Sequence, residues 1–490
     1  GVRKSEFSPT HPNTVSAGGR VLIENLEFKI EISFRTRVVF SFAVNEALRY
    51  RALMVSGSID RAILHLGAPA ALAALLQAGF LVVDTFWLGK VGPVALAAAS
   101  TAGFTMWLAQ TLGEGMAMGS GSVLSRSVGA EDEAGTSRAA VAGQALGVWG
   151  SAAVSGVGLV ASHAAFAFMG TAADVTAEGL RYMWVILAGM PAYFIFVWLS
   201  AAFRAVGDAR TPLKLLAVAA AVNLVVDPLL IFGTGPLPVL GVMGAAIATV
   251  ASWVVAGVLG WILLGKLGIR PPVLGFLKPP IGETWSALRV GFPLAAEGAL
   301  FSLIYILLTR VMTSFGTPEV AALGVGHKLE ELNYFVCAGM GAAANTLVCQ
   351  NLGADDPGRA VRFALRTLLL TCLPVGAVTI LLVSFPGAAI GVFSGDPNVV
   401  AAGTTYVLLV GLTQLFMAAE VVMLGAFAGA QWTALPAAIV IGFTAVRVPF
   451  AMWLVSIGWG VEAVWFAIAS TTVVKGTILA TLFGFRYGRG

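Results

Sequence analysis

The stretch that decides the fold is Leu215-Leu-Ala-Val-Ala-Ala-Ala-Val-Asn223-Leu-Val-Val-Asp227-Pro228-Leu-Leu-Ile-Phe232. It is almost wholly apolar and long enough to cross most of a bilayer. Asn223 and Asp227 are four residues apart, so on a helix they lie on the same face, one turn from each other. The stretch therefore predicts a membrane-spanning helix that carries two polar side chains at depth.

A carboxylate at this depth in a membrane span is energetically unfavourable. A lone charge at the centre of a membrane helix costs about 2.5–3.5 kcal/mol on insertion scales. We therefore expect Asp227 to face the protein interior or a cavity, as part of an ion or proton site rather than as the cap of a kinked helix. Pro228 removes one backbone hydrogen bond beside the acid and leaves a carbonyl that is free to join the site.

The composition is that of a helical protein with many membrane spans. Of the 490 residues, 58% are hydrophobic and 11% are charged, whereas a soluble protein carries about 25% charged residues. The 58 glycines suit close helix packing in lipid. The sequence has no metal-ligand spacing of histidines, no phosphate loop and no Ser/His/Asp nucleophile motif. We expect no enzyme activity, no cofactor, no structural metal and no nucleic-acid partner.

Residues 1–58 differ from the rest of the chain, because charged residues interrupt every apolar run. Acids are frequent and no uninterrupted apolar core follows the basic residues, so this segment is not a cleavable signal peptide. Residues 1–20 are expected to be disordered. Residues 21–55 are expected to form an amphipathic helix on the membrane surface, or an extension without a fold of its own.

Apolar runs of about 20 residues recur along the remaining chain. Twelve of them predict membrane-spanning helices, at 62–88, 94–122, 138–163, 178–203, 212–233, 241–265, 285–313, 318–349, 361–385, 399–428, 433–456 and 461–484. The prediction is an all-α polytopic membrane protein with two six-helix lobes, 59–265 and 284–490. The proline-rich segment 266–283 is expected to be a cytoplasmic linker between them.

Basic residues are distributed unevenly among the predicted loops. The loops after even-numbered spans, with their flanks, hold Arg126, Arg138, Arg204, Arg210, Lys214, Lys266, Arg270, Lys278, Arg289, Arg359, Arg362 and Arg366. The loops after odd-numbered spans hold only Lys90, Arg181 and Arg310. By the positive-inside rule, the even loops and both chain termini are expected in the cytoplasm of a protein of the inner (plasma) membrane.

The chain repeats itself at a constant offset of 224 residues. Gly67-Ala-Pro69 recurs as Gly291-Phe-Pro293, Gly129-Ala-Glu-Asp132 as Gly353-Ala-Asp-Asp356, Tyr182 as Tyr406 and Pro212 as Pro436. Six spans per repeat is an even number, so both repeats begin on the same side of the membrane. This predicts a parallel repeat about an axis along the membrane normal, with two lobes in a V around a central cleft.

The two halves of the repeat differ at the position of the predicted ion site. At the same offset Asn223 corresponds to Arg447, and Asp227 corresponds to Ala451. The first lobe thus has a carboxyl–amide pair where the second lobe has a cation. This asymmetry favours a single cation or proton site, in the first lobe.

Asp84, near the end of the first apolar run, is the second acid of the predicted site; the alternative is an interfacial cap. Two carboxyls in a low-dielectric site cannot both stay ionised at low cost. With Asn223 and the Thr249 hydroxyl as further ligands, Asp84 and Asp227 are expected to take up and release a proton or a small cation.

Several motifs together resemble one transporter family. Pro69, Asp84 and Gly89 are followed by Arg204-Ala-Val-Gly-Asp-Ala-Arg-Thr-Pro212, Asn223-x3-Asp227-Pro228 and Gly241-Val-Met-Gly-Ala-Ala-Ile-Ala-Thr249. Val325-Gly-His-Lys-Leu-Glu330 and Gln350-Asn-Leu-Gly-Ala354 lie in the second lobe. Over residues 60–484 the chain resembles the multidrug and toxic compound extrusion (MATE) family, in its prokaryotic DinF-like branch.

The resemblance implies an antiporter that exports organic cations and other amphipathic compounds in exchange for protons or Na⁺, by alternating access and as a monomer. Its coupling residues correspond to Asp84, Asn223, Asp227 and Thr249. A further asparagine of some relatives corresponds most nearly to Ser200. Glu297 matches the acid of the sodium-coupled branch only loosely, which favours proton coupling.

The second lobe also carries charges inside predicted spans. We expect internal pairing, for example of Arg447 with Glu297 or Glu420. The alternative is that Glu297 or Glu330 faces the cleft and attracts cationic substrate, and Tyr305 is a candidate to stack on flat cations.

Three other functions fit the sequence less well. A lipid-linked precursor flippase of the same wider superfamily needs a cationic cleft for a pyrophosphate group, whereas the first lobe offers acids and an amide. An intramembrane enzyme needs a nucleophile or metal set, and none occurs at helical spacing. A channel fits a parallel repeat with one acidic site less well than alternating access does.

Overall fold

The computed structural model describes residues 49–169, 171–233 and 238–487. Within these ranges the chain is almost wholly helical and contains no strand. The long helices are α2 (Ile59–Val91), α3 (Pro93–Gly129), α4 (Glu133–Met169), α5 (Ala173–Ala205), α6 (Arg210–Phe232), α7 (Val242–Lys266), α8 (Ile281–Met312), α9 (Thr317–Gly353), α10 (Pro357–Ser384), α12 (Pro397–Gly411), α13 (Gln414–Gly429), α14 (Ala434–Ser456) and α15 (Glu462–Tyr487). Two short elements, η1 (Gly275–Leu277) and α11 (Pro386–Gly391), lie between them.

The predicted all-α polytopic fold is confirmed. Ten of the described helices are long and apolar enough to cross a membrane. The predicted span 399–428 is a broken one, formed by α12 and α13 with a bend of 53° between them. Helix α3, which occupies the second predicted span, is rich in glycine, serine and threonine. This composition suits a helix in the middle of the fold, packed against α4, α5, α8 and α9.

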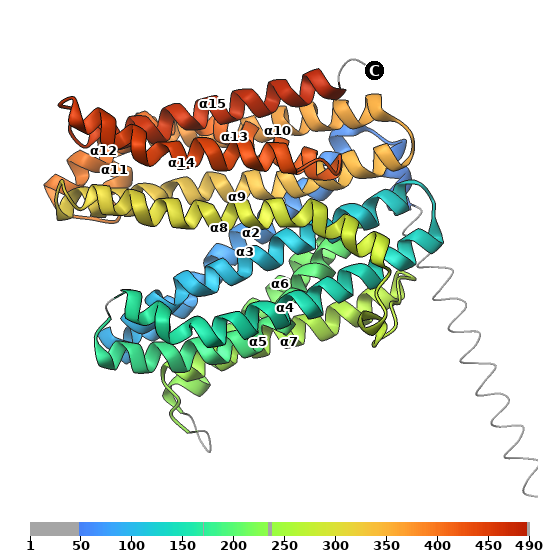
Figure 1. Ribbon diagram of the computed structural model, residues 1–490, viewed down its shortest axis with the longest axis horizontal. Helices are drawn as coiled ribbons and strands as arrows, with labels where there is room; N and C mark the ends of the chain where they lie inside the picture. Colours follow the sequence, from blue (N-terminus) through green and yellow to red (C-terminus); the bar gives the residue numbers. More distant parts are fainter. Residues whose placement is uncertain (1–48, 170, 234–237, 488–490) are drawn as a thin grey trace, which may run out of the picture.

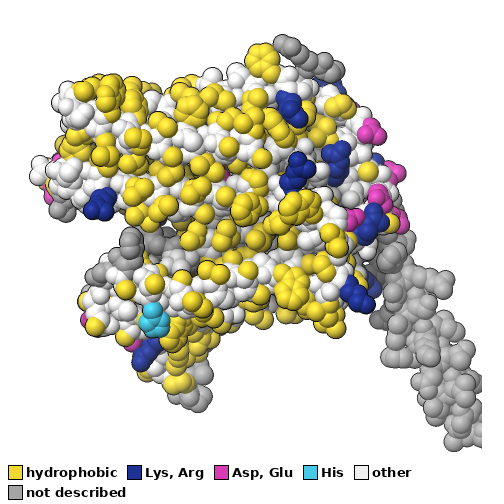
Figure 2. Space-filling model, in the orientation of Figure 1, with side chains coloured by type: hydrophobic (Ala, Val, Ile, Leu, Met, Phe, Trp, Pro, Cys, Tyr) yellow, Lys and Arg dark blue, Asp and Glu magenta, His cyan; other side chains and the backbone are white. Residues whose placement is uncertain are grey.

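The helices form two groups that meet at one end and separate at the other (Figure 1). Helices α8 to α15 make one group and α4 to α7 the other, while α2 and α3 cross between them. Figure 2 shows the hollow between the two groups and a face covered mostly by hydrophobic side chains, with charged ones gathered mainly at the narrow end. This is the predicted V shape of two lobes.

The repeat found in the sequence recurs as a pair of matching contacts between the lobes. Gly115 on α3 lies against the backbone of Ala295 on α8, and Gly339 on α9 lies against the backbone of Ala71 on α2. The two pairs are related by the offset of 224 residues. Each glycine lets two backbones approach closely because it has no side chain. The lobes are therefore joined by crossed contacts, α3 with α8 and α2 with α9.

These close approaches predict a stability effect. A Cβ at Gly119 on α3 would meet the Ala287 carbonyl and the Gly291 backbone on α8. Gly119→Ala is expected to lower the free energy of unfolding by about 1–3 kcal/mol, because backbone atoms cannot yield as a flexible side chain can. The matched control is Gly156→Ala on α4, where a Cβ meets open space. Titration with SDS in bicelles, followed by tryptophan fluorescence, measures both; equal stability of the two variants would contradict the prediction.

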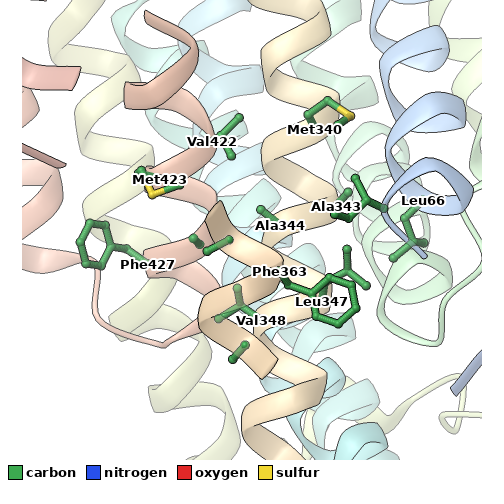
Figure 3. Packing of buried hydrophobic residues seen from close by; sticks show 14 of the residues in the cluster. Leu66, Met340, Ala343, Ala344, Leu347, Val348, Phe363, Val422, Met423 and Phe427 are labelled. Carbon is green, nitrogen blue, oxygen red and sulfur yellow. The ribbon is translucent and has the colours of Figure 1, made fainter. Parts of the chain in front are cut away.

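One hydrophobic cluster ties the first helix of one lobe to the other lobe (Figure 3). Its labelled members are Leu66 on α2, Met340, Ala343, Ala344, Leu347 and Val348 on α9, Phe363 on α10, and Val422, Met423 and Phe427 on α13. All of them are buried. The cluster stabilises the crossing of α2 over α9.

The end of the N-terminal extension docks on the fold. Residues 49–55 are helical, and Met54 is buried in the same cluster. Arg51 Nη2 donates to the Gly129 carbonyl (2.9 Å), and Arg51 forms an ion pair with Glu131 (2.6 Å). Residues 49–58 therefore belong to the packed structure. The expectations for residues 1–48 lie outside the described residues.

Candidate ion-binding site

The structure brings the four predicted first-lobe residues together. Asp84 lies on α2, Asn223 and Asp227 on α6, and Thr249 on α7, and they are 7%, 0%, 0% and 1% exposed. Asn223 Nδ2 donates to Asp227 Oδ1 (3.1 Å) and to Thr249 Oγ1 (3.4 Å). Thr249 Oγ1 donates to Asp84 Oδ2 (3.3 Å). The Asp84 and Asp227 carboxyls also lie within electrostatic reach of each other.

Three oxygens of this set have no partner. Asp84 Oδ1, Asn223 Oδ1 and Asp227 Oδ2 are buried without a hydrogen bond. A buried carboxylate or amide oxygen without a partner is costly, so the set favours a proton shared by the carboxyls or a small cation held by the oxygens. Oxygen atoms of this kind are the ligands that hard cations prefer. The arrangement is chemically suited to binding one positive charge and releasing it.

The sequence of α6 around Pro228 determines how Asn223 and Asp227 are placed in the site. Helix α6 continues through Pro228 to Phe232, and a proline inside a helix leaves the carbonyl four residues earlier, that of Leu224, without its amide donor. Asn223 and Asp227 share one face of α6, as their spacing predicted. Ser200, the other polar candidate of the first lobe, instead donates to the Phe196 carbonyl of its own helix (2.9 Å).

Two further polar residues of the first lobe were not assigned to a site from the sequence. Tyr182 on α5 is buried and lies within electrostatic reach of both Asp84 and Asp227. Glu114 on α3 is exposed and accepts a hydrogen bond from the Tyr193 hydroxyl (3.0 Å). Glu114 carries a usable signal, because it is an acid inside an apolar run and is flanked by two glycines.

The predicted partners of Arg447 are wrong. Its guanidinium bonds neither Glu297 nor Glu420 but three hydroxyls: Nε donates to Thr471 (2.8 Å), Nη2 to Thr472 (2.9 Å) and Nη1 to Tyr305 (3.1 Å). The rotation of α14 decides this, because it turns Arg447 toward α15 and α8.

Internal pairing does occur in the second lobe, but with a different cation. Lys475 Nζ on α15 donates to Glu420 Oε1 on α13 (2.6 Å) and to Thr444 Oγ1 on α14 (3.1 Å). Glu297 is half-buried on α8 and makes no hydrogen bond or ion pair with the rest of the described chain.

Glu330 on α9 is held by neutral donors. Its carboxylate accepts hydrogen bonds from the Tyr406 hydroxyl (2.6 Å) and from Gln414 Nε2 (2.8 Å). Glu330 and Tyr305 thus lie in two different hydrogen-bonded sets and Glu297 in neither, whereas the four first-lobe residues form one set.

Comparison with known proteins agrees with this fold. The MatE family model matches residues 69–229 and 293–453, two copies at the offset of 224 residues. The chain is 25% identical over 427 residues to a probable multidrug resistance protein NorM of Thermotoga maritima, covering 87% of this chain and 92% of the relative. A probable multidrug resistance protein NorM of Deinococcus radiodurans is 29% identical over 446 residues, covering 88% and 96%. An FAD transporter of Shewanella oneidensis is 28% identical over 359 residues, covering 73% and 79%.

Solved structures have the same fold. An outward-facing multidrug resistance MATE family transporter superimposes with a TM-score of 0.83 at 21% identity, covering 89% of this chain and 98% of the other. A crystal structure of MATE in the straight conformation gives 0.82, with the same identity and coverage. Because the family model matches both halves of the fold, the chain belongs to the MatE family, the multidrug and toxic compound extrusion transporters.

Proposed function

We propose that the protein is a secondary active multidrug efflux antiporter, which exports organic cations and other amphipathic compounds in exchange for protons. Its family and the names of its relatives support the transport class. The observation that carries the coupling role is the buried set of Asp84, Asn223, Asp227 and Thr249 with its three unpaired oxygens. Na⁺ is the alternative coupling ion, because the same oxygens suit it.

The proposed cycle follows from the charge of this set. A proton that binds Asp84 and Asp227 removes the repulsion between two carboxylates and changes how α2 and α6 pack. The lobe then loses affinity for a cationic substrate, which leaves through the open end. After the lobes reverse, release of the proton restores the negative charge and a cation binds from the other side. This exchange requires only that proton and substrate favour different states.

The orientation and organisation of the protein are part of the proposal. The lobes are residues 59–265 and 284–490, and the linker 266–283 lies against α4, where Gln144 Nε2 donates to the Val273 carbonyl (2.7 Å). The loops rich in arginine lie at the narrow end of the V, which by the positive-inside rule faces the cytoplasm. The structure then corresponds to an outward-open monomer in the inner membrane, with both termini cytoplasmic.

A flippase for a lipid-linked precursor is not favoured. Such a substrate carries a pyrophosphate group, which needs a cluster of cations, whereas the buried polar set of the first lobe is acidic. Enzyme activity is likewise no part of the proposal, since the protein belongs to a transport family.

Proton and sodium coupling are separated by imposing the two gradients one at a time. Inverted membrane vesicles with an acidic lumen are expected to accumulate ethidium, and a sodium gradient alone is expected to give no accumulation. Ethidium is a permanent cation, so a pH gradient cannot trap it without a transporter. Accumulation driven by a sodium gradient alone would show that Na⁺, and not the proton, is the coupling ion. If neither gradient drove accumulation, antiport would be refuted.

A further inference from the structure

Residues 49–58 form a strap that leads into α2 at the narrow end of the V (Figure 1). On its second-lobe side the strap is held through its backbone. Asn351 Nδ2 on α9 donates to the Met54 carbonyl (3.2 Å), and Arg359 Nη2 on α10 donates to the Gly57 carbonyl. The Met54 side chain is buried. The strap is therefore anchored firmly to the second lobe.

A single arginine ties the strap to the first lobe. Arg51 Nε donates to the Val128 carbonyl (3.2 Å) and Nη2 to the Gly129 carbonyl (2.9 Å). Arg51 also forms the ion pair with Glu131. Val128 and Gly129 are the last residues of α3. The terminal carbonyls of a helix lack amide donors and carry partial negative charge, so a guanidinium is a favourable partner for them.

The strap thus crosses the junction where the two lobes meet directly. On α9, Gln350 Nε2 donates to the Ala205 carbonyl at the end of α5 (2.7 Å), and Cys349 Sγ donates to the Ser122 carbonyl on α3 (2.8 Å). A Cβ at Gly129 would meet the backbone of Gln350. These contacts close the narrow end. A motion that opens this end separates α9 from α3 and α5, and the strap then has to leave one of the two lobes.

The two sides of the strap differ in how readily they separate. Leaving the second lobe would expose Met54 and would remove the donors of two strap carbonyls. On the first-lobe side the contacts are the Arg51 side chain, which is 23% exposed, and the half-buried Tyr50 side chain beside Gly207. Exposing a fully buried apolar side chain is more costly than releasing partly exposed groups that water can solvate. The strap is therefore expected to stay on the second lobe and to part from the first.

We propose that the strap is a releasable latch of the narrow end. Arg51 binds the end of α3 while this end is closed, and it releases α3 when the lobes part there. Because these bonds exist only in the closed state, they shift the equilibrium toward that state by their full free energy. This inference rests on the proposed alternating-access cycle, in which the narrow end has to open, and adds a residue that sets the balance between the two states.

Two native thiols on α9 can report whether the narrow end opens. Cys349 is buried between α9 and α3, at the junction of the lobes. Cys337 is also buried, but it packs against Val375 and Ala418 inside the second lobe. Opening of the narrow end therefore exposes Cys349 and not Cys337, whereas unfolding exposes both. Full-length chains that keep one of these two thiols, with the other cysteines replaced by alanine, are labelled with N-ethylmaleimide in nanodiscs without any gradient. At low reagent concentration the labelling rate follows the fraction of open molecules.

Arg51→Met is expected to raise the labelling rate of Cys349 by roughly 5- to 30-fold, because charge-assisted hydrogen bonds are lost from the closed state alone. The labelling rate of Cys337 is expected to change by less than about twofold, since the fold of the second lobe is kept. Arg51→Lys keeps the charge but not the planar fork, so it is expected to give a smaller rise. It also tests the latch if Arg51→Met fails to fold. Arg362→Met removes an exposed arginine of α10 at the same end and is expected to change neither rate.

The contrary results are equally specific. Unchanged labelling of Cys349 in both Arg51 variants would overturn the latch. A parallel rise at Cys337 would overturn it too, because it would show loss of the fold rather than opening. Selective exposure of Cys349 in a protein that accumulates ethidium under neither gradient would support the latch and refute the proposed antiport. Unchanged labelling in a protein that accumulates ethidium under a pH gradient would refute the latch and leave antiport standing.

Discussion

Asp227→Asn is expected to abolish gradient-driven dye export. Asparagine has the size of aspartate and can still bond Asn223, but it neither takes up a proton nor carries a charge. The Asp84 carboxyl then faces a neutral amide instead of a second acid, and the pair loses the alternation of charge on which exchange depends. Export of ethidium, measured in vesicles with an imposed pH gradient, is expected to fall to the level of vesicles without the protein.

The controls for this result separate coupling from folding. Asp84→Asn is expected to give the same loss, since both carboxyls belong to one site. Asp355→Asn replaces an exposed loop aspartate whose backbone has φ 57°, a conformation that asparagine tolerates, and is expected to export as wild type does. Ethidium binding to purified Asp227→Asn shows whether the fold is intact. Export at the wild-type rate by either site variant would remove that residue from the mechanism.

The fold was open to prediction because its main signals are local in the sequence. The length of an apolar run gives a membrane span wherever the run occurs. The recurrence of Gly67 as Gly291 and of Pro212 as Pro436 at one offset gives the repeat without any knowledge of packing. The pairing of Asn223 with Asp227 is of the same kind, since one turn of helix places them together.

The features that could not be predicted from the sequence depend on how the helices are rotated and packed. The 53° bend in the predicted span 399–428 follows Gly411, the last residue of α12, but one glycine among the 58 of the chain does not by itself predict a bend. Asp84 and Thr249 lie in other predicted spans than Asp227, so sequence spacing could not bring them to it; their place in the site was a hypothesis from their polar character inside apolar runs, which the resemblance to a family then supported. The partner of Arg447 could not be read from the sequence, since the rotation of α14 decides whether it reaches acids or hydroxyls.

The Lys475–Glu420 ion pair is the second contact for which we expect a large effect. The two side chains are 2% and 11% exposed, and their charged atoms are 2.6 Å apart. Glu297 also lies within electrostatic reach of Lys475. Removal of the cation therefore leaves Glu420, and with it Glu297, without a compensating charge in a region from which water is largely excluded.

Lys475→Met is expected to lower the free energy of unfolding by about 3–5 kcal/mol, because breaking a buried pair leaves an uncompensated charge. The double variant Glu420→Gln/Lys475→Met removes both charges and is expected to regain most of that loss, since a neutral pair needs no counter-ion. The surface pair Lys328–Glu331, with Lys328 64% exposed, is the matched control, and Lys328→Met is expected to cost less than about 1 kcal/mol. Titration with SDS in bicelles measures all three. If the double variant were as unstable as Lys475→Met, the loss would come from the packing of the lysine stem and not from its charge; a double variant near wild type would show that the pair neutralises a buried acid.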